Sequence, residues 1–89
     1  MVSLEKHGRI RSEINQLNKK GIEMVKSRNY DEAIAYFDEA LKINPRNETS
    51  SSNKVSCLIS AGRLDEAVQC CDEFLKVNPK SEVILIRKA

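Results

Sequence analysis

The sequence predicts an all-α protein, and three observations support this fold class. The segment NYDEAIAYFDEALKINP at residues 29–45 matches RLDEAVQCCDEFLKVNP at residues 63–79, so the chain repeats itself at an offset of 34 residues. Within each copy the apolar residues recur at intervals of three and four, which is the period of an amphipathic helix. Both copies end at an Asn-Pro pair, and the residue before a proline is disfavoured in a helix.

The first predicted helix lies upstream of both copies and covers residues 9–27. Its apolar residues follow one another at intervals of four, three, four and three: Ile10, Ile14, Leu17, Gly21 and Met24. This spacing places them on one helical face. Residues 1–13 are expected to include an N-terminal extension of this helix.

The second predicted helix covers residues 29–45 and has both a start and a stop in its sequence. Asn29 is a candidate N-cap, and Glu32 stands three residues later, which is the spacing of a capping box. Acidic residues near the start and Lys42 near the end also suit the helix dipole. The matching helix at residues 63–79 lacks the Asn cap, so its start is less well defined.

The run of hydroxyl residues in NETSSSNKVSCLI, residues 47–59, is ambiguous. Serine and threonine side chains compete for backbone hydrogen bonds, so composition favours a linker at residues 48–54. The repeat favours a helix, because a shift of 34 residues places the apolar frame of the first helix on this segment. We predict a helix here with Asn47 as its N-cap, and the linker stays open as the alternative.

Composition limits the classes of function. The chain has 15 basic and 13 acidic residues, and its net charge of +2 leaves no strong electrostatic attraction to nucleic acid or membranes. The three cysteines show no CxxC spacing and no nearby histidine, so we interpret them as buried thiols in a reducing compartment, with a metal or redox role as the alternative. We expect no cofactor. The absence of a long apolar run or a signal peptide predicts a cytoplasmic protein without membrane association.

No residue pattern points to catalysis. The sequence has no Ser/His/Asp or Cys/His grouping at usable spacing and no glycine-rich phosphate loop. Its carboxylates fall on the predicted solvent faces of helices, where they keep a helix surface hydrated. The sequence therefore predicts that the protein is not an enzyme.

The repeat resembles the tetratricopeptide repeat family. The residues that carry the resemblance are Leu17, Gly21, Tyr30, Ala33, Phe37, Ala40 and Pro45 in the first unit, and Leu58, Gly62, Leu64, Ala67, Cys71 and Pro79 in the second. The resemblance implies a right-handed superhelical stack of antiparallel helix-turn-helix repeats. It divides the single domain 1–89 into the helix extension 1–13, repeat one at 14–47, repeat two at 48–81, and a capping or truncated third-repeat helix at 82–89.

The second unit departs from the family pattern. Ser51 and Cys71 are small where the family has bulk, whereas Val55 and Phe74 are large where it has Gly or Ala. Cores tolerate such exchanges when the total volume is kept. We expect Phe74 to fill the space left at Ser51 and Cys71.

By resemblance, the first helix of each unit forms a concave surface that binds a peptide or a partner segment, so the chain is expected to act as a scaffold or adaptor. On this sequence the surface maps to Asn15, Asn18, Lys19, Ile22, Lys26, Thr49, Ser52, Asn53, Ser56, Ile59, Ser60 and Arg87. This set contains three basic residues and no acid. The expected ligand is a peptide that is acidic or ends in a carboxylate.

Three alternatives remain open. The apolar ends of a short repeat array, including VILI at residues 83–86, could drive homo-oligomerisation. A co-chaperone-like domain that binds acidic C-terminal peptides matches the family clamp at Asn53 and Arg87, but Asn18, Ile22 and Val83 depart from it. Nucleic-acid binding would use the basic residues before residue 29, yet no aromatic residues are interleaved there for stacking, so we expect no nucleic-acid partner.

Overall fold

The computed structural model describes residues 2–79, and their side chains from residue 10 onward. The described chain forms four helices and no strand: α1 (Val2–Lys26), α2 (Tyr30–Ile43), α3 (Glu48–Ser60) and α4 (Leu64–Val77). The all-α fold class is therefore confirmed. The expectations for residues 82–89, Arg87 among them, fall outside the described residues.

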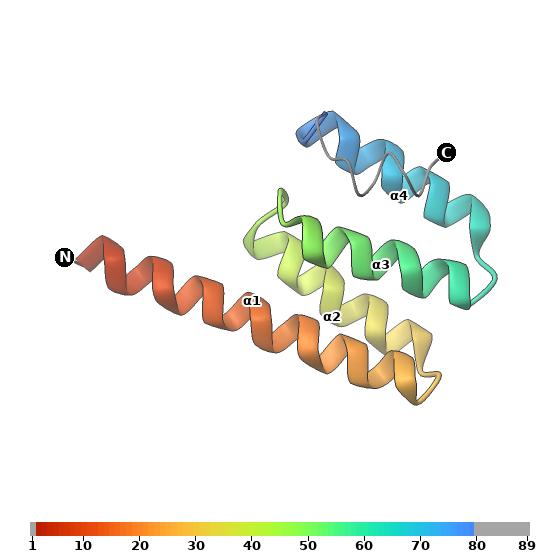
Figure 1. The fold of residues 1–89 in the computed structure, drawn as a ribbon, viewed down its shortest axis with the longest axis horizontal. Coiled ribbons are helices and arrows are strands. Elements are labelled where there is room, and N and C mark those ends of the chain that lie inside the picture. The colour runs from red at the N-terminus through yellow and green to blue at the C-terminus, as the bar shows by residue number, and fades with distance from the viewer. Residues whose placement is uncertain (1, 80–89) are drawn as a thin grey trace.

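Consecutive helices pack against each other along the chain, and α1 also contacts α3 (Figure 1). The helices thus form two hairpins, α1–α2 and α3–α4, that lie side by side. α1 is 25 residues long, whereas α2 has 14 residues. The N-terminal part of α1 therefore projects beyond the turn between α2 and α3, as the red ribbon in Figure 1 shows.

The serine run is helical, as the repeat predicts, because its polar groups find partners. Asn47 is the N-cap of α3, and its side-chain oxygen accepts a hydrogen bond from the Ser50 N–H at 2.8 Å. Ser50 and Ser51 are buried. The Ser50 hydroxyl lies 2.9 Å from the amide oxygen of Asn18 on α1 and 2.9 Å from that of Asn47, so it can donate to either. These contacts offset the weak helix propensity of the segment.

The capping box expected at Asn29 is wrong. Asn29 stands at the N-cap position of α2, but its side chain makes no capping hydrogen bond. Its backbone N–H instead donates to the carbonyl oxygen of Met24 at 2.8 Å, while the Arg28 N–H donates to Val25 at 2.9 Å. These two bonds close the C-terminus of α1 in a Schellman motif. The short connection between α1 and α2 therefore holds Asn29 at φ −89° and ψ 71°, away from the extended backbone of the Asn47 cap.

The same motif closes α3, with one difference in residue type. Gly62 has φ 77° at the left-handed position, and Arg28 occupies the equivalent position of the first unit at φ 63°. Only glycine adopts this conformation without steric cost, since the Cβ of other L-residues crowds the backbone. The first hairpin therefore contains a strained residue that the second avoids.

We expect Arg28→Gly to raise the free energy of unfolding by up to about 1 kcal/mol. The left-handed conformation costs a non-glycine residue roughly 1 to 2 kcal/mol, and the larger chain entropy of unfolded glycine offsets part of the gain. Urea denaturation followed by circular dichroism measures the change. Arg28→Ala is the control, because it removes the same charge and keeps the Cβ. If both variants had the same stability, backbone strain at residue 28 would not explain the gain.

The core consists of two adjoining clusters. One contains Ala33, Phe37 and Cys57, and the other is built mainly from α4 and the back half of α3: Val55, Leu58, Ala67, Cys70, Cys71 and Phe74. The three cysteines are buried and form no disulfide, in agreement with their interpretation as small core residues. Phe74 is buried beside Cys71 in the second cluster. A hollow of about 180 Å³ is still lined by Ser51 and Phe74, so Phe74 fills the expected space only in part.

Gly21 lets α1 and α2 approach closely. A Cβ at this position would lie 2.4 Å from Cε1 of Phe37, whose ring is fully buried. Phe37 thus occupies the space that a side chain at residue 21 would need.

No helix within the described part of the chain is both long enough and apolar enough to cross a membrane.

Candidate binding surface

The residues predicted to bind a partner lie on two neighbouring helices. From α1 come Asn15, Lys19, Ile22 and Lys26, and from α3 come Thr49, Ser52, Asn53, Ser56, Ile59 and Ser60; we call this set the α1–α3 face. All four α1 residues are exposed, as are Thr49, Ile59 and Ser60. Ser52, Asn53 and Ser56 are half-buried. Packing of α1 against α3 brings the two groups onto adjoining surfaces.

Asn18 is the exception, since the sequence placed it on the exposed surface and the structure buries it. Only 5% of the residue is accessible to solvent. The amide oxygen of Asn18 lies 2.9 Å from the Ser50 hydroxyl on α3. Asn18 therefore joins the two hairpins and is left out of the binding surface.

The side-chain amide nitrogen of Asn53 has no hydrogen-bond acceptor among the described residues. Its Nδ2 atom is buried and makes no hydrogen bond with the described residues. A buried donor without an acceptor is costly, by roughly 1 to 3 kcal/mol. Buried polar atoms are normally hydrogen-bonded, so this amide is a candidate for an acceptor that the described residues do not supply.

Two cations of the α1–α3 face, and Arg11 beside it on α1, lack an anionic partner among the described side chains. Among the side chains described, Arg11, Lys19 and Lys26 form no ion pair. Lys54, by contrast, is paired, since its ammonium lies 2.7 Å from Asp38 on α2. Free cations on one helix face attract an acidic ligand, and salt screens this attraction.

Arg63 is the opposite case, because two carboxylates hold it. Its guanidinium lies 2.8 Å from Asp31 at the start of α2 and 2.7 Å from Glu66 in the first turn of α4. The hydrogen bond from Arg63 holds the pKa of Glu66 below its usual value. This cluster links the two hairpins at the turn end of the molecule and leaves Arg63 occupied.

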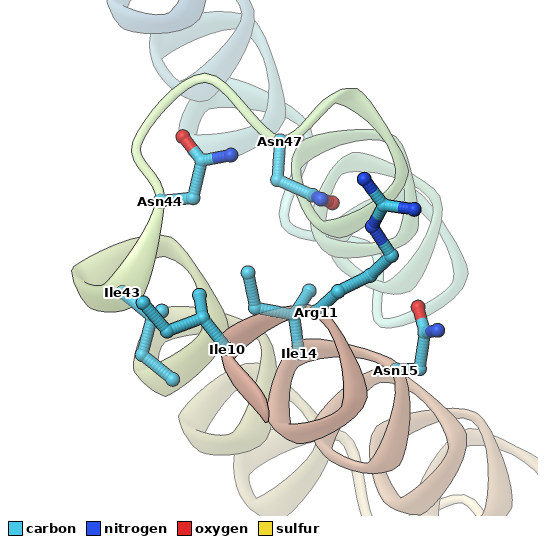
Figure 2. A pocket seen from close by; sticks show the side chains of 7 residues that line it. All are labelled: Ile10, Arg11, Ile14, Asn15, Ile43, Asn44 and Asn47. Atoms are coloured by element: carbon cyan, nitrogen blue, oxygen red, sulfur yellow. The ribbon is translucent and has the colours of Figure 1, made fainter. Parts of the chain in front are cut away.

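A hollow of about 320 Å³ opens where α1 passes the turn between α2 and α3 (Figure 2). We call it the Arg11 hollow, and its lining residues are Ile10, Arg11, Ile14, Asn15, Ile43, Asn44 and Asn47. Figure 2 shows Arg11 reaching from α1 toward Asn47, with the isoleucines on the α1 and α2 sides. A second hollow, of about 330 Å³, lies on α1 and shares Arg11 and Asn15 with the first. Both hollows lie at the N-terminal end of the α1–α3 face.

No sequence pattern assigned Ile43 or Asn44 to a site, Arg11 belonged only to the nucleic-acid alternative, and Asn47 was predicted only as a helix cap. Arg11 lies upstream of the first repeat, outside the frame from which the surface was mapped. Its spacing of four from Asn15 was the available signal, because residues four apart share a helix face. The contribution of the α2–α3 turn depends on tertiary packing and had no signal in the sequence.

The described side chains offer little for covalent or metal chemistry. Burial raises the pKa of the Cys57 thiol and the pKa of the Cys70 thiol, which keeps both in the less reactive protonated form at neutral pH. No group of three or more His, Cys, Asp or Glu residues within the described part of the chain could hold a metal ion. The surface is suited to reversible contacts through hydrogen bonds, charge and apolar side chains.

Comparisons with known proteins agree with this architecture. A family model described as Tetratricopeptide repeat matches residues 24–87. The chain is also 37% identical, over 53 residues, to the protein called TPR repeat-containing thioredoxin TTL4 of Arabidopsis thaliana. That match covers 60% of this chain and 8% of the relative, so the chain spans only a small part of the relative's length. No solved structure gives a significant match.

Proposed function

The chain belongs to the tetratricopeptide repeat family, and from this premise we propose that it is a non-enzymatic scaffold or adaptor that binds a peptide segment of a partner protein on the α1–α3 face. Proteins built from such repeats serve as protein-interaction modules, and stacked repeats present extended surfaces for this purpose. The observation that carries the proposal is the buried, unpaired Nδ2 of Asn53 on this face. Because Nδ2 is shielded from solvent, the Asn53 side chain would rotate outward for a backbone carbonyl of a bound peptide to supply the missing acceptor.

The charges and apolar side chains of the face favour an acidic peptide. Lys19 and Lys26 have no anionic partner among the described side chains, so carboxylates of a ligand would neutralise them. Ile22 is 40% exposed and Ile59 is 44% exposed, and they would bury apolar area against the same ligand. The proposed ligand therefore combines acidic residues with at least one apolar residue.

Peptide selection tests this proposal. We expect wild-type protein to select acidic sequences from a library of random dodecapeptides. Asn53→Ala and Lys26→Glu should each weaken binding of the best peptide about tenfold, which corresponds to about 1.4 kcal/mol. Titration calorimetry measures the affinities. Lys42→Glu is the matched control, because it makes the same charge change at an exposed position of α2, away from the face. Equal loss in Lys42→Glu, or none in either test variant, would place recognition elsewhere.

The alternatives from the sequence stay predictions. Self-assembly would use the outer surface of α4, where Leu64 and Val68 are exposed. A co-chaperone-like clamp would need an accessible side chain at residue 18, and the burial of Asn18 argues against that alternative.

A further inference from the structure

We propose that the Arg11 hollow binds a carboxylate that stands next to an aliphatic side chain in the partner peptide. This inference rests on the proposed function, because it assigns one part of the bound peptide to a specific site. The site differs from the α1–α3 face in using the α2–α3 turn, and only Asn15 belongs to both.

The two asparagines of the turn present donors to the hollow because their acceptors are already used. The side-chain oxygen of Asn44 accepts from the Arg46 N–H at 3.0 Å. The side-chain oxygen of Asn47 accepts from the Ser50 N–H at 2.8 Å. Each amide nitrogen is therefore the end left for a ligand, and Figure 2 shows the Asn44 nitrogen turned toward Asn47. Fixed backbone contacts hold both amides in place, so a ligand need not order them.

Arg11 adds a positive charge beside these donors. It is exposed and forms no ion pair with the described side chains, and none of the described residues that line the hollow is acidic. A guanidinium with neighbouring amide donors matches the acceptor oxygens of a carboxylate. A neutral or cationic group would leave this charge unpaired, so charge complementarity selects an anion.

Apart from Asn15, the remaining lining residues are three isoleucines, which give the site a second requirement. Ile14 is buried, whereas Ile10 is half-buried and Ile43 is 37% exposed. The volume of about 320 Å³ lies at the small end of ligand pockets, which range from roughly 300 to 1,000 Å³. The hollow therefore fits a short element with an anionic end and an aliphatic part, as one or two residues of a peptide can provide.

A small carboxylic acid tests the chemistry of the hollow directly. We expect 4-methylpentanoate, titrated into the isotopically labelled chain, to shift the NMR signals of the Asn44 and Asn47 side-chain amides in a saturable way. The neutral isostere 4-methylpentanamide and the short acid acetate should each bind at least fivefold more weakly. Equal binding of the amide would overturn the role of the charge, and equal binding of acetate would overturn the aliphatic requirement. No shift at these amides would overturn the site.

A variant series separates this proposal from the proposed function. Arg11→Gln should weaken 4-methylpentanoate at least fivefold, while Lys20→Gln, which removes an exposed charge elsewhere on α1, should stay within twofold of wild type. Unchanged binding in Arg11→Gln would overturn the inference. If Asn53→Ala still weakened the selected peptide in that case, the function would stand without this site.

Two peptides distinguish where the carboxylate comes from. One ends in leucine with a free carboxylate, and the other carries an internal Glu-Leu pair and an amidated end. The peptide whose affinity falls in Arg11→Gln identifies the source, and either result supports the inference. If neither peptide were sensitive to Arg11→Gln, the hollow would not take part in peptide recognition.

Discussion

Gly21→Val is expected to destabilise the protein by about 3 kcal/mol, the upper end of the usual cost of overpacking a core. The new Cβ would lie 2.4 Å from Cε1 and 2.7 Å from Cζ of Phe37. Because Phe37 is fully buried, its ring has no free space into which to move, and protein interiors are closely packed. Urea denaturation of the variant measures the loss.

The second repeat indicates how this loss can be reversed. Val55 and Cys71 occupy the positions equivalent to Gly21 and Phe37, and both are buried in one cluster. A smaller residue opposite the valine thus makes room for it. We expect Phe37→Cys to restore stability to Gly21→Val, so that the double variant loses at least about 1 kcal/mol less than the sum of the two single losses. Ala35→Val, at an exposed position of α2, is the surface control. Additive losses would contradict direct packing between residues 21 and 37.

Phe74→Ala should cost about 3 to 5 kcal/mol, as other deletions of large buried side chains do. Phe74 is 4% exposed and contributes to the main cluster between α3 and α4. The hollow beside Ser51 would become larger, and the remaining side chains could not refill it. For a domain of this size such a loss approaches the whole stability of the fold.

The matched comparison for Phe74→Ala is Val77→Ala on the same helix. Val77 is 40% exposed, so its truncation should cost well under the value for Phe74. Denaturant midpoints and slopes, read for both variants, give the two free energies. Comparable losses would show that α4 packs differently from the arrangement described here.

The repeat predicts the fold better than local composition does. The serine run would have been assigned to a linker on propensity alone, yet Asn47 caps it and burial of Ser50 and Ser51 fixes it in the core. The 34-residue offset succeeds because equivalent helices share the same packing environment. The capping box at Asn29 fails because the preceding turn sets that residue's backbone, and a local motif does not include that constraint.

The candidate surface was predictable in outline but not residue by residue. A helical spacing identifies which residues share a face, and it placed Lys19, Ile22 and Lys26 correctly at exposed positions. The boundary between face and interior depends on how α1 packs against α3, and Asn18 is buried where the two helices meet. Arg11 and the asparagines of the α2–α3 turn come together only because α1 extends past that turn.

The two hairpins are fastened by contacts of different character at opposite ends of α3. At its N-terminal end a neutral, buried hydrogen bond joins Ser50 to Asn18, whereas at its C-terminal end Arg63 bridges Asp31 and Glu66 in contact with water. Dissolved ions weaken exposed charge pairs and leave the buried contact unchanged. Rising ionic strength should therefore weaken the Arg63 contacts more than the hydrogen bond between Ser50 and Asn18.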